Sequence, residues 1–160
     1  MSKTAHHNIR VVPYEPQYAE AFYHINKIWI DRYFMMEPKD HDALEHPEEN
    51  IISPGGTILV ALANSIPVGV CALLPSNRKG CKFELAKMGV SEHFQGLGIG
   101  RLLCEKALET ARKLGAAKVY LESNTMLTPA LTLYRSLGFR EVDGGKSPYS
   151  RSNIQMEVLL

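Results

Sequence analysis

Three alternating glycines stand where a strand-like segment passes into a helix-like one. The stretch QGLGIG is followed by apolar residues at helical spacing. Backbone N–H groups in the first turn of a helix have no intrahelical partner, and the helix dipole favours negative charge there. Because glycine adopts unusual backbone angles and lets a ligand approach closely, the stretch predicts a cradle for a phosphate-bearing ligand. Its members are Gln95, Gly96, Leu97, Gly98, Ile99, Gly100 and Arg101, whose side chain either adds charge or faces solvent.

The spacing of these glycines tests several interpretations. A P-loop is excluded because no Lys-Ser or Lys-Thr pair follows them. A dinucleotide fingerprint begun at Gly96 would need its third glycine at Arg101, although Glu122 stands near the position of a ribose-binding acid. The sequence also allows a third interpretation, in which the glycine-rich turn only packs a helix against a sheet.

A resemblance to a known family supplies another interpretation. QGLGIG fits the pattern Gln/Arg-x-x-Gly-x-Gly/Ala of the GNAT N-acetyltransferase superfamily. FELAKMGVSEHF resembles that family's central strand, and ALTLYRSLGFREV resembles its C-terminal helix and next strand, so the resemblance spans roughly Thr57 to Leu160. It implies an α/β GNAT fold: a mixed central β-sheet flanked by helices on both faces, with splayed central strands. It also implies that the glycine loop wraps the pyrophosphate of acetyl-coenzyme A (acetyl-CoA), while the backbone of Met88 and Val90 meets the pantetheine arm.

The implied reaction needs a base and an acid. An amine with a pKa near ~10.4 is only about one part in a thousand neutral at pH 7, so its proton must be removed before it attacks a thioester. Tyr134 holds the tyrosine position of the family's LY…GF pattern, which implies that it protonates the departing thiolate. By spacing alone Tyr134 is a core aromatic, since Ala130, Leu131 and Leu137 lie at helical distances from it.

Glu84 is the predicted base, acting directly or through a water. It lies six residues before Val90, at a position where some GNAT enzymes carry a catalytic glutamate. Glu122 is the second candidate for the base. An ordinary glutamate on a solvated strand face is the alternative. Strand alternation predicts two faces here: Glu84, Ala86 and Met88 on one, and Leu85, Lys87 and Gly89 on the other.

Further binding residues are predicted around this centre. Many GNAT chains carry an asparagine where this one has Leu127, and Asn124 is the nearest replacement for that cofactor contact. Recognition of the acceptor is expected from the first helix and the last loop, where an arginine would suit a carboxylate or phosphate. The candidates are Trp29, Arg32, Tyr33, Tyr149 and Arg151.

The elements that must position these residues follow from periodicity and turn signals. Their order is a strand, one or two helices, three strands, a helix, a strand, a helix and two strands. The expected strands are 8–13, 56–62, 67–74, 81–90, 117–123, 138–142 and 153–160, and the expected helices are 16–34, 99–114 and 128–137, with one short helix between 35 and 56.

Length and composition bound the rest. The 160 residues predict one domain, 1–160, and the formal net charge of +1 gives no global field for nucleic acid or a membrane. Three cysteines without CxxC spacing, no signal-peptide pattern and no zinc motif predict a cytoplasmic protein with reduced thiols and no metal. A homodimer is compatible with this fold.

These inferences lead to one expected activity. The chain is expected to be an acyltransferase that moves an acetyl group from acetyl-CoA to a primary amine, by direct attack in a ternary complex. The acceptor is a small molecule or a peptide and is not identified by the sequence. The alternative is a non-catalytic acyl-CoA-binding sensor of the same fold.

Overall fold

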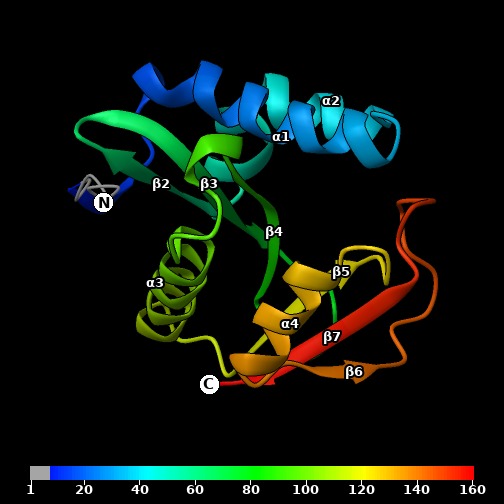
Figure 1. Ribbon diagram of the computed structural model, residues 1–160. Helices are drawn as coiled ribbons and strands as arrows, with labels where there is room; N and C mark the ends of the chain where they lie inside the picture. The colour runs from blue at the N-terminus through cyan, green and yellow to red at the C-terminus, as the bar shows by residue number, and fades with distance from the viewer. Residues whose placement is uncertain (1–7) are drawn as a thin grey trace.

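The computed structural model describes residues 8–160, which form seven strands and four α-helices with three short helical turns (Figure 1). The strands are β1 (Ile9–Pro13), β2 (Thr57–Ala63), β3 (Ile66–Pro75), β4 (Phe83–Val90), β5 (Lys118–Ser123), β6 (Arg140–Val142) and β7 (Ile154–Leu159). The helices are α1 (Ala19–Tyr33), α2 (Pro38–Glu45), α3 (Ile99–Lys113) and α4 (Thr128–Ser136), and the short turns are η1 (Pro16–Tyr18), η2 (Glu48–Ile52) and η3 (Glu92–Phe94).

All seven strands join one sheet in the order β1-β2-β3-β4-β5-β7-β6. Every neighbouring pair is antiparallel except β4 and β5, which run parallel. The predicted mixed sheet is therefore confirmed. The segment between α1 and β2 holds α2 and also η2, one element more than expected there.

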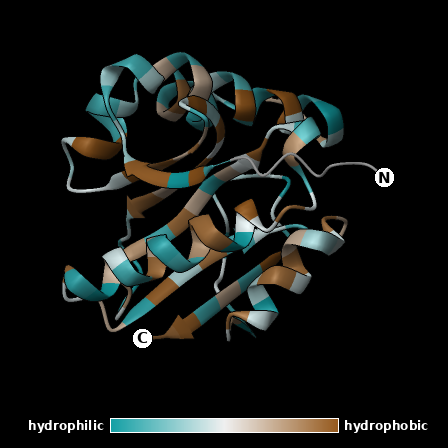
Figure 2. Ribbon diagram, turned by 60° about the vertical axis from the view of Figure 1, so that its left-hand side comes forward, coloured by the Kyte–Doolittle hydropathy of each residue, from teal (hydrophilic) through white to brown (hydrophobic). Residues whose placement is uncertain are grey.

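Helices cover both faces of the sheet, as predicted. One core lies between the sheet and α3 with α4, where Leu103, Cys104 and Leu131 are buried. The other lies under α1 and α2, where Phe22 and Leu44 are buried. Figure 2 shows helices that alternate between hydrophobic and hydrophilic residues. Burial of the apolar stripes fixes each helix on its face of the sheet.

The two central strands separate part of the way along their length. β4 pairs with β5 only over Phe83–Leu85, opposite Val119–Leu121. Beyond Leu85, β4 runs on to Val90 without a partner on β5 among the described strands. One backbone edge of β4 is therefore free of strand pairing on this side. The predicted splay is confirmed.

A bulge in β4 overturns the predicted alternation of its side chains. Ala86 faces Ala72 across the β3–β4 pair and Gly89 faces Val70, so β4 has one residue more than β3 between these pairs. Lys87 takes the extra position with a left-handed φ of 52°. The expected grouping is wrong beyond Ala86 because the bulge shifts the phase. Met88 packs on the α3 side, with Phe83 and Leu85, whereas Lys87 reaches α2 on the side of Glu84.

Candidate active site

The glycine loop has the geometry of an anion cradle at the N-terminus of α3. Gly96 and Gly98 have φ values of 78° and 80°, which explains the glycines at these two positions. A Cβ atom on either would meet no atom of the described chain within 4 Å, so the space over the backbone is open. Gly98 is the N-cap of α3 and no described side chain caps this helix, which leaves its first N–H groups available. A pyrophosphate group fits this arrangement.

The side chains of the loop lie mostly away from this cradle. Gln95 donates from Nε2 to the carbonyl of Val90 at 3.1 Å and so braces the loop against the end of β4. The side chain of Ile99 is buried in the core and that of Leu97 is exposed. Each of these two residues would therefore contact a ligand in the cradle through its backbone. Arg101 pairs with neighbours on the helix surface, donating to Ser136 Oγ at 2.9 Å and bridging to Glu105 at 2.9 Å. Its guanidinium is thus engaged outside the loop.

Tyr134 lies on α4 beside the sulfur atoms of the α3 core. Its ring packs edge-on against Phe139, with centroids 5.9 Å apart. Burial raises the pKa of Tyr134, and the nearby Cys104 and Cys71 add to the effect. Cys104 Sγ also lies 3.2 Å from Met88 Sδ, which links Tyr134 to the free end of β4. The ring of Tyr134 is therefore packed in the core, and its hydroxyl is protonated and lies beside the gap between β4 and β5.

Glu84 lies on the opposite face of β4, next to β5. Its Cα partner on β5 is Tyr120. Burial raises the pKa of Glu84 to about 7, with a further increase from Glu122 and opposing effects from Lys87 and Lys39. Within residues 8–160 its carboxylate has no hydrogen-bond donor. A half-buried carboxyl that changes its protonation near neutral pH is suited to proton transfer.

An ion network beside Glu84 was not predicted from the sequence. Asp40 on α2 binds Lys87 Nζ at 2.7 Å and both terminal nitrogens of Arg151 at 2.6 Å. Burial opposes ionisation of Asp40, but the hydrogen bonds from Arg151 and Lys87 lower its pKa to about 2. Arg151 also reaches Glu37 at 3.2 Å, so two carboxylates of this chain already hold its guanidinium. A lysine in the interior of a mostly apolar strand was the sequence signal for this network.

Tyr149 lies between the two cations of this network. Lys87 Nζ donates to the Tyr149 hydroxyl at 3.1 Å and lies 4.6 Å from its ring centroid, and the Arg151 guanidinium lies 4.6 Å from the same centroid. Burial raises the pKa of Tyr149, helped by Asp40 and Glu84. The structure therefore brings Tyr149 and Arg151 together with the face of β4 that carries Glu84.

The remaining predicted residues occupy separate places. Trp29 covers β4 at Gly89, where a Cβ atom would lie 3.0 Å from Trp29 Cδ1. Tyr33 is 47% exposed beside Arg32. Asn124 donates to the carbonyl of Arg151 at 2.7 Å and accepts from the backbone of Met126. Asn124 thus braces the last loop, and Tyr33 is not gathered with the other candidates.

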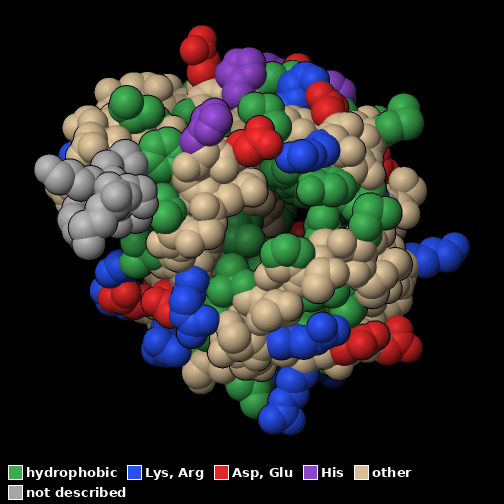
Figure 3. Space-filling model, viewed as in Figure 1, with side chains coloured by type: hydrophobic (Ala, Val, Ile, Leu, Met, Phe, Trp, Pro, Cys, Tyr) green, Lys and Arg blue, Asp and Glu red, His purple; other side chains and the backbone are tan. Residues whose placement is uncertain are grey.

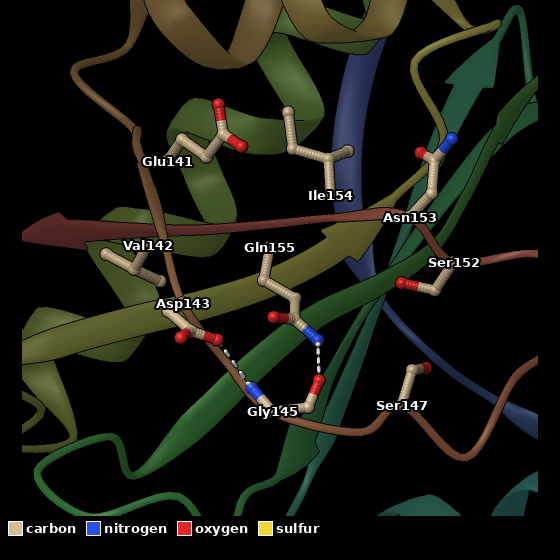
Figure 4. A pocket seen from close by; sticks show the side chains of 9 residues that line it. All are labelled: Glu141, Val142, Asp143, Gly145, Ser147, Ser152, Asn153, Ile154 and Gln155. Carbon is tan, nitrogen blue, oxygen red and sulfur yellow. Dashed lines mark hydrogen bonds between the residues drawn. The ribbon is translucent and has the colours of Figure 1, made fainter.

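Two hollows adjoin these groups. Figure 3 shows a hollow bordered by hydrophobic side chains near the middle of the face where β4 ends, between α1 and α4. A second cavity of about 610 Å³ lies where β6 and β7 meet the loop that connects them (Figure 4). Ser147 borders this cavity and donates to Glu122 Oε2 at 2.5 Å. Its lining is mostly polar: Glu141, Val142, Asp143, Gly145, Ser147, Ser152, Asn153, Ile154 and Gln155.

Residues 8–160 contain neither a membrane-spanning helix nor a cluster of metal-ligating side chains. No helix there has both the length and the hydrophobicity needed to cross a membrane. Nor do three or more His, Cys, Asp or Glu side chains in that range gather as a metal-ion site.

Comparison with known proteins places this geometry in a family. Residues 19–139 match the Acetyltransferase (GNAT) family. An uncharacterized N-acetyltransferase of Schizosaccharomyces pombe is 31% identical over 120 residues, covering 74% of this chain and 71% of that protein. A GNAT-family acetyltransferase structure from Staphylococcus aureus superposes with a TM-score of 0.83 at 23% identity, over 94% of this chain and 98% of that one. A Bacillus subtilis acetyltransferase in complex with CoA gives a TM-score of 0.71 at 20% identity, over 95% of this chain and 99% of that one. The chain therefore belongs to the GNAT acetyltransferase family.

Proposed function

We propose that this protein transfers an acetyl group from acetyl-CoA to a primary amine of a small molecule or peptide, by direct attack in a ternary complex. One observation carries the proposal: β4 leaves β5 after Leu85, with Tyr134 on one side of the separated strand and Glu84 on the other. A proton donor and a proton acceptor thus flank the same gap from opposite faces of the sheet.

The donor side of the gap suits a coenzyme A thioester. The open glycine loop at the start of α3 would hold the pyrophosphate. The unpaired edge of β4 at Met88 and Val90 would offer backbone groups to the amides of the pantetheine arm. The Bacillus subtilis relative, crystallised with CoA, supports this choice of ligand. The side chains of Asn124 and Arg101 already bind the Arg151 carbonyl and the Ser136 hydroxyl, so neither is assigned a direct contact with the cofactor.

The acceptor side suits an amine that arrives as an ammonium ion. Glu84 takes the proton from the nitrogen, and the freed lone pair attacks the thioester carbonyl carbon. As the tetrahedral intermediate collapses, the C–S bond breaks and Tyr134 gives its proton to the departing thiolate. The second proton of the amine nitrogen leaves to solvent as the amide forms, and Tyr134 and Glu84 then return to their starting protonation states by exchange with solvent. With a pKa near 7, Glu84 is a better base than a carboxyl of ordinary pKa and is still about half ionised at neutral pH.

Glu84 is preferred to Glu122 as the base. Both oxygens of Glu122 already accept hydrogen bonds, from Tyr120 and from Ser147, whereas the carboxylate of Glu84 has no such donor within the described chain. A base needs a free lone pair directed at the proton it removes. Trp29, which covers Gly89, and Tyr149, which contacts Lys87, would border the acceptor.

Calorimetric titration with acetyl-CoA, with NAD as the control ligand, tests the donor assignment. We expect micromolar binding of acetyl-CoA alone. A panel of primary amines then tests the transfer, with release of free CoA thiol as the signal. Binding of acetyl-CoA without amine-dependent thiol release would favour a non-catalytic sensor, and absence of binding would overturn the proposal.

A further inference from the structure

Glu84 and Glu122 lie on neighbouring parallel strands and face the same side of the sheet. Glu84 is the Cα partner of Tyr120 across the β4–β5 pair. Glu122 follows Tyr120 by two positions on β5, and side chains two apart on a strand share a face. The two carboxylates are therefore neighbours on the side of the gap assigned to the acceptor.

Glu122 is held in a fixed position by two hydroxyl groups. Tyr120 donates to its Oε1 at 2.7 Å and Ser147 donates to its Oε2 at 2.5 Å. Tyr120 is itself immobilised, since it is 5% exposed and the Arg78 guanidinium lies 4.6 Å from its ring centroid. Ser147 belongs to the loop that borders the hairpin cavity, where Figure 4 shows its side chain beside the opening. Within residues 8–160, no ion pair to a cation neutralises Glu122.

We propose that Glu122 is a positioning residue: a fixed negative charge that strengthens Glu84 as a base and draws the ammonium group of the acceptor toward it. This inference rests on the proposed function and assigns Glu122 a role through Glu84 rather than in proton transfer itself. Ser147 and Tyr120 then serve to hold that charge at a constant distance from Glu84.

The other charges around Glu84 decide the direction of the effect. Lys87 on β4 and Lys39 on α2 lower the pKa of Glu84, while Glu122 on β5 raises it. The neighbouring hydroxyls are those of Tyr120 on β5 and Tyr149 on the last loop. Removing the charge of Glu122 leaves the two lysines unopposed, so Glu84 should ionise at lower pH. The ammonium of Lys87 is held by Asp40 and does not move to compensate.

The test follows the carboxyl group of Glu84 directly. The full chain, labelled with carbon-13 at its glutamate carboxyls, is titrated by NMR, and the Glu84 signal is assigned by its loss in Glu84→Gln. We expect a midpoint near 7 in the unsubstituted protein and a midpoint lower by roughly half a unit or more in Glu122→Gln. Glu141→Gln is the matched control, because it removes an exposed glutamate on β6 and should leave the midpoint unchanged.

An unchanged Glu84 midpoint in folded Glu122→Gln overturns the inference. If that variant does not fold, Glu122→Ala removes the same charge with a smaller side chain, and an unchanged midpoint there overturns it equally. The titration needs neither acetyl-CoA nor an acceptor, so its outcome is separate from failure of the proposed function. With an active amine, the acidic limb of kcat/KM against pH should shift down with the NMR midpoint in Glu122→Gln.

Discussion

Lys87 Nζ lies 2.7 Å from Asp40 Oδ1, and this ion pair joins the bulge of β4 to helix α2. The side chains are 4% and 0% exposed, so both charges are inside the protein. Arg151 binds the same carboxylate with two nitrogens, which ties the last loop to the pair. A buried charge is tolerated only with such partners. The pair therefore fixes the side of β4 on which the proposed acceptor site is built.

Replacing Asp40 should destabilise the protein strongly. Asp40→Asn leaves Lys87 and Arg151 without their shared counter-charge, and removing one partner of a buried pair costs about 3–5 kcal/mol. Urea unfolding at pH 7 measures the free energy of unfolding. Asp42→Asn, an exposed position on the same helix, is the control and should change it by less than about 0.5 kcal/mol. Equal midpoints for Asp40→Asn and the unsubstituted protein would show that the pair does not stabilise the fold.

The pH dependence of the same pair has a definite sign. The pKa of Asp40 falls from 3.8 to about 2 on folding. Its contribution is therefore complete above about pH 4 and is lost as the pH falls through about 2. Between about pH 4 and pH 2 the unsubstituted protein should lose the free energy of unfolding that ionised Asp40 contributes. We expect Asp40→Asn to show no such loss across that interval. An identical loss of stability in both proteins would contradict this.

The sequence predicted the elements and the glycine loop because both depend on local signals. Hydrophobic period, turn residues and glycines at a strand-to-helix junction are properties of neighbouring residues. The bulge at Lys87 was missed because it depends on the register between β3 and β4 and on Asp40, which is 47 positions away in sequence. The same limit explains Arg151, whose partners on α2 could not be seen from its own segment.

Two glycines of the loop should respond differently to alanine. Gly98 has a φ of 80°, so Gly98→Ala should cost about 1 kcal/mol in stability and weaken acetyl-CoA binding by disturbing the cradle. Gly100 is helical, and a Cβ there would meet Leu133 Cδ2 at an ordinary 3.6 Å. Gly100→Ala should therefore keep its stability and lose less affinity than Gly98→Ala. Calorimetric Kd values and thermal melts of the two variants decide the matter, and equal affinities would count against the cradle.

Tyr134→Phe should separate chemistry from binding. Loss of the hydroxyl removes the proposed proton donor, and we expect kcat to fall by about 100-fold. The ring contact with Phe139 is retained, so stability and the Kd for acetyl-CoA should change little. Stopped-flow thiol release and calorimetry give the two quantities. Turnover equal to that of the unsubstituted protein would leave Tyr134 as a core aromatic only.

Glu84→Gln should make the protein more stable at alkaline pH while reducing transfer. The pKa of Glu84 rises from 4.5 to about 7 on folding, chiefly through burial. Its protonated form favours the folded state, and that contribution is complete below about 4.5 and is lost as the pH rises through about 7. Glutamine does not ionise, so the variant should gain about 3 kcal/mol at pH 8 and less than about 1 kcal/mol at pH 5. Urea unfolding at the two pH values tests this, and a gain that is equal at both would mean that Glu84 ionises in the folded protein as it does in the unfolded chain.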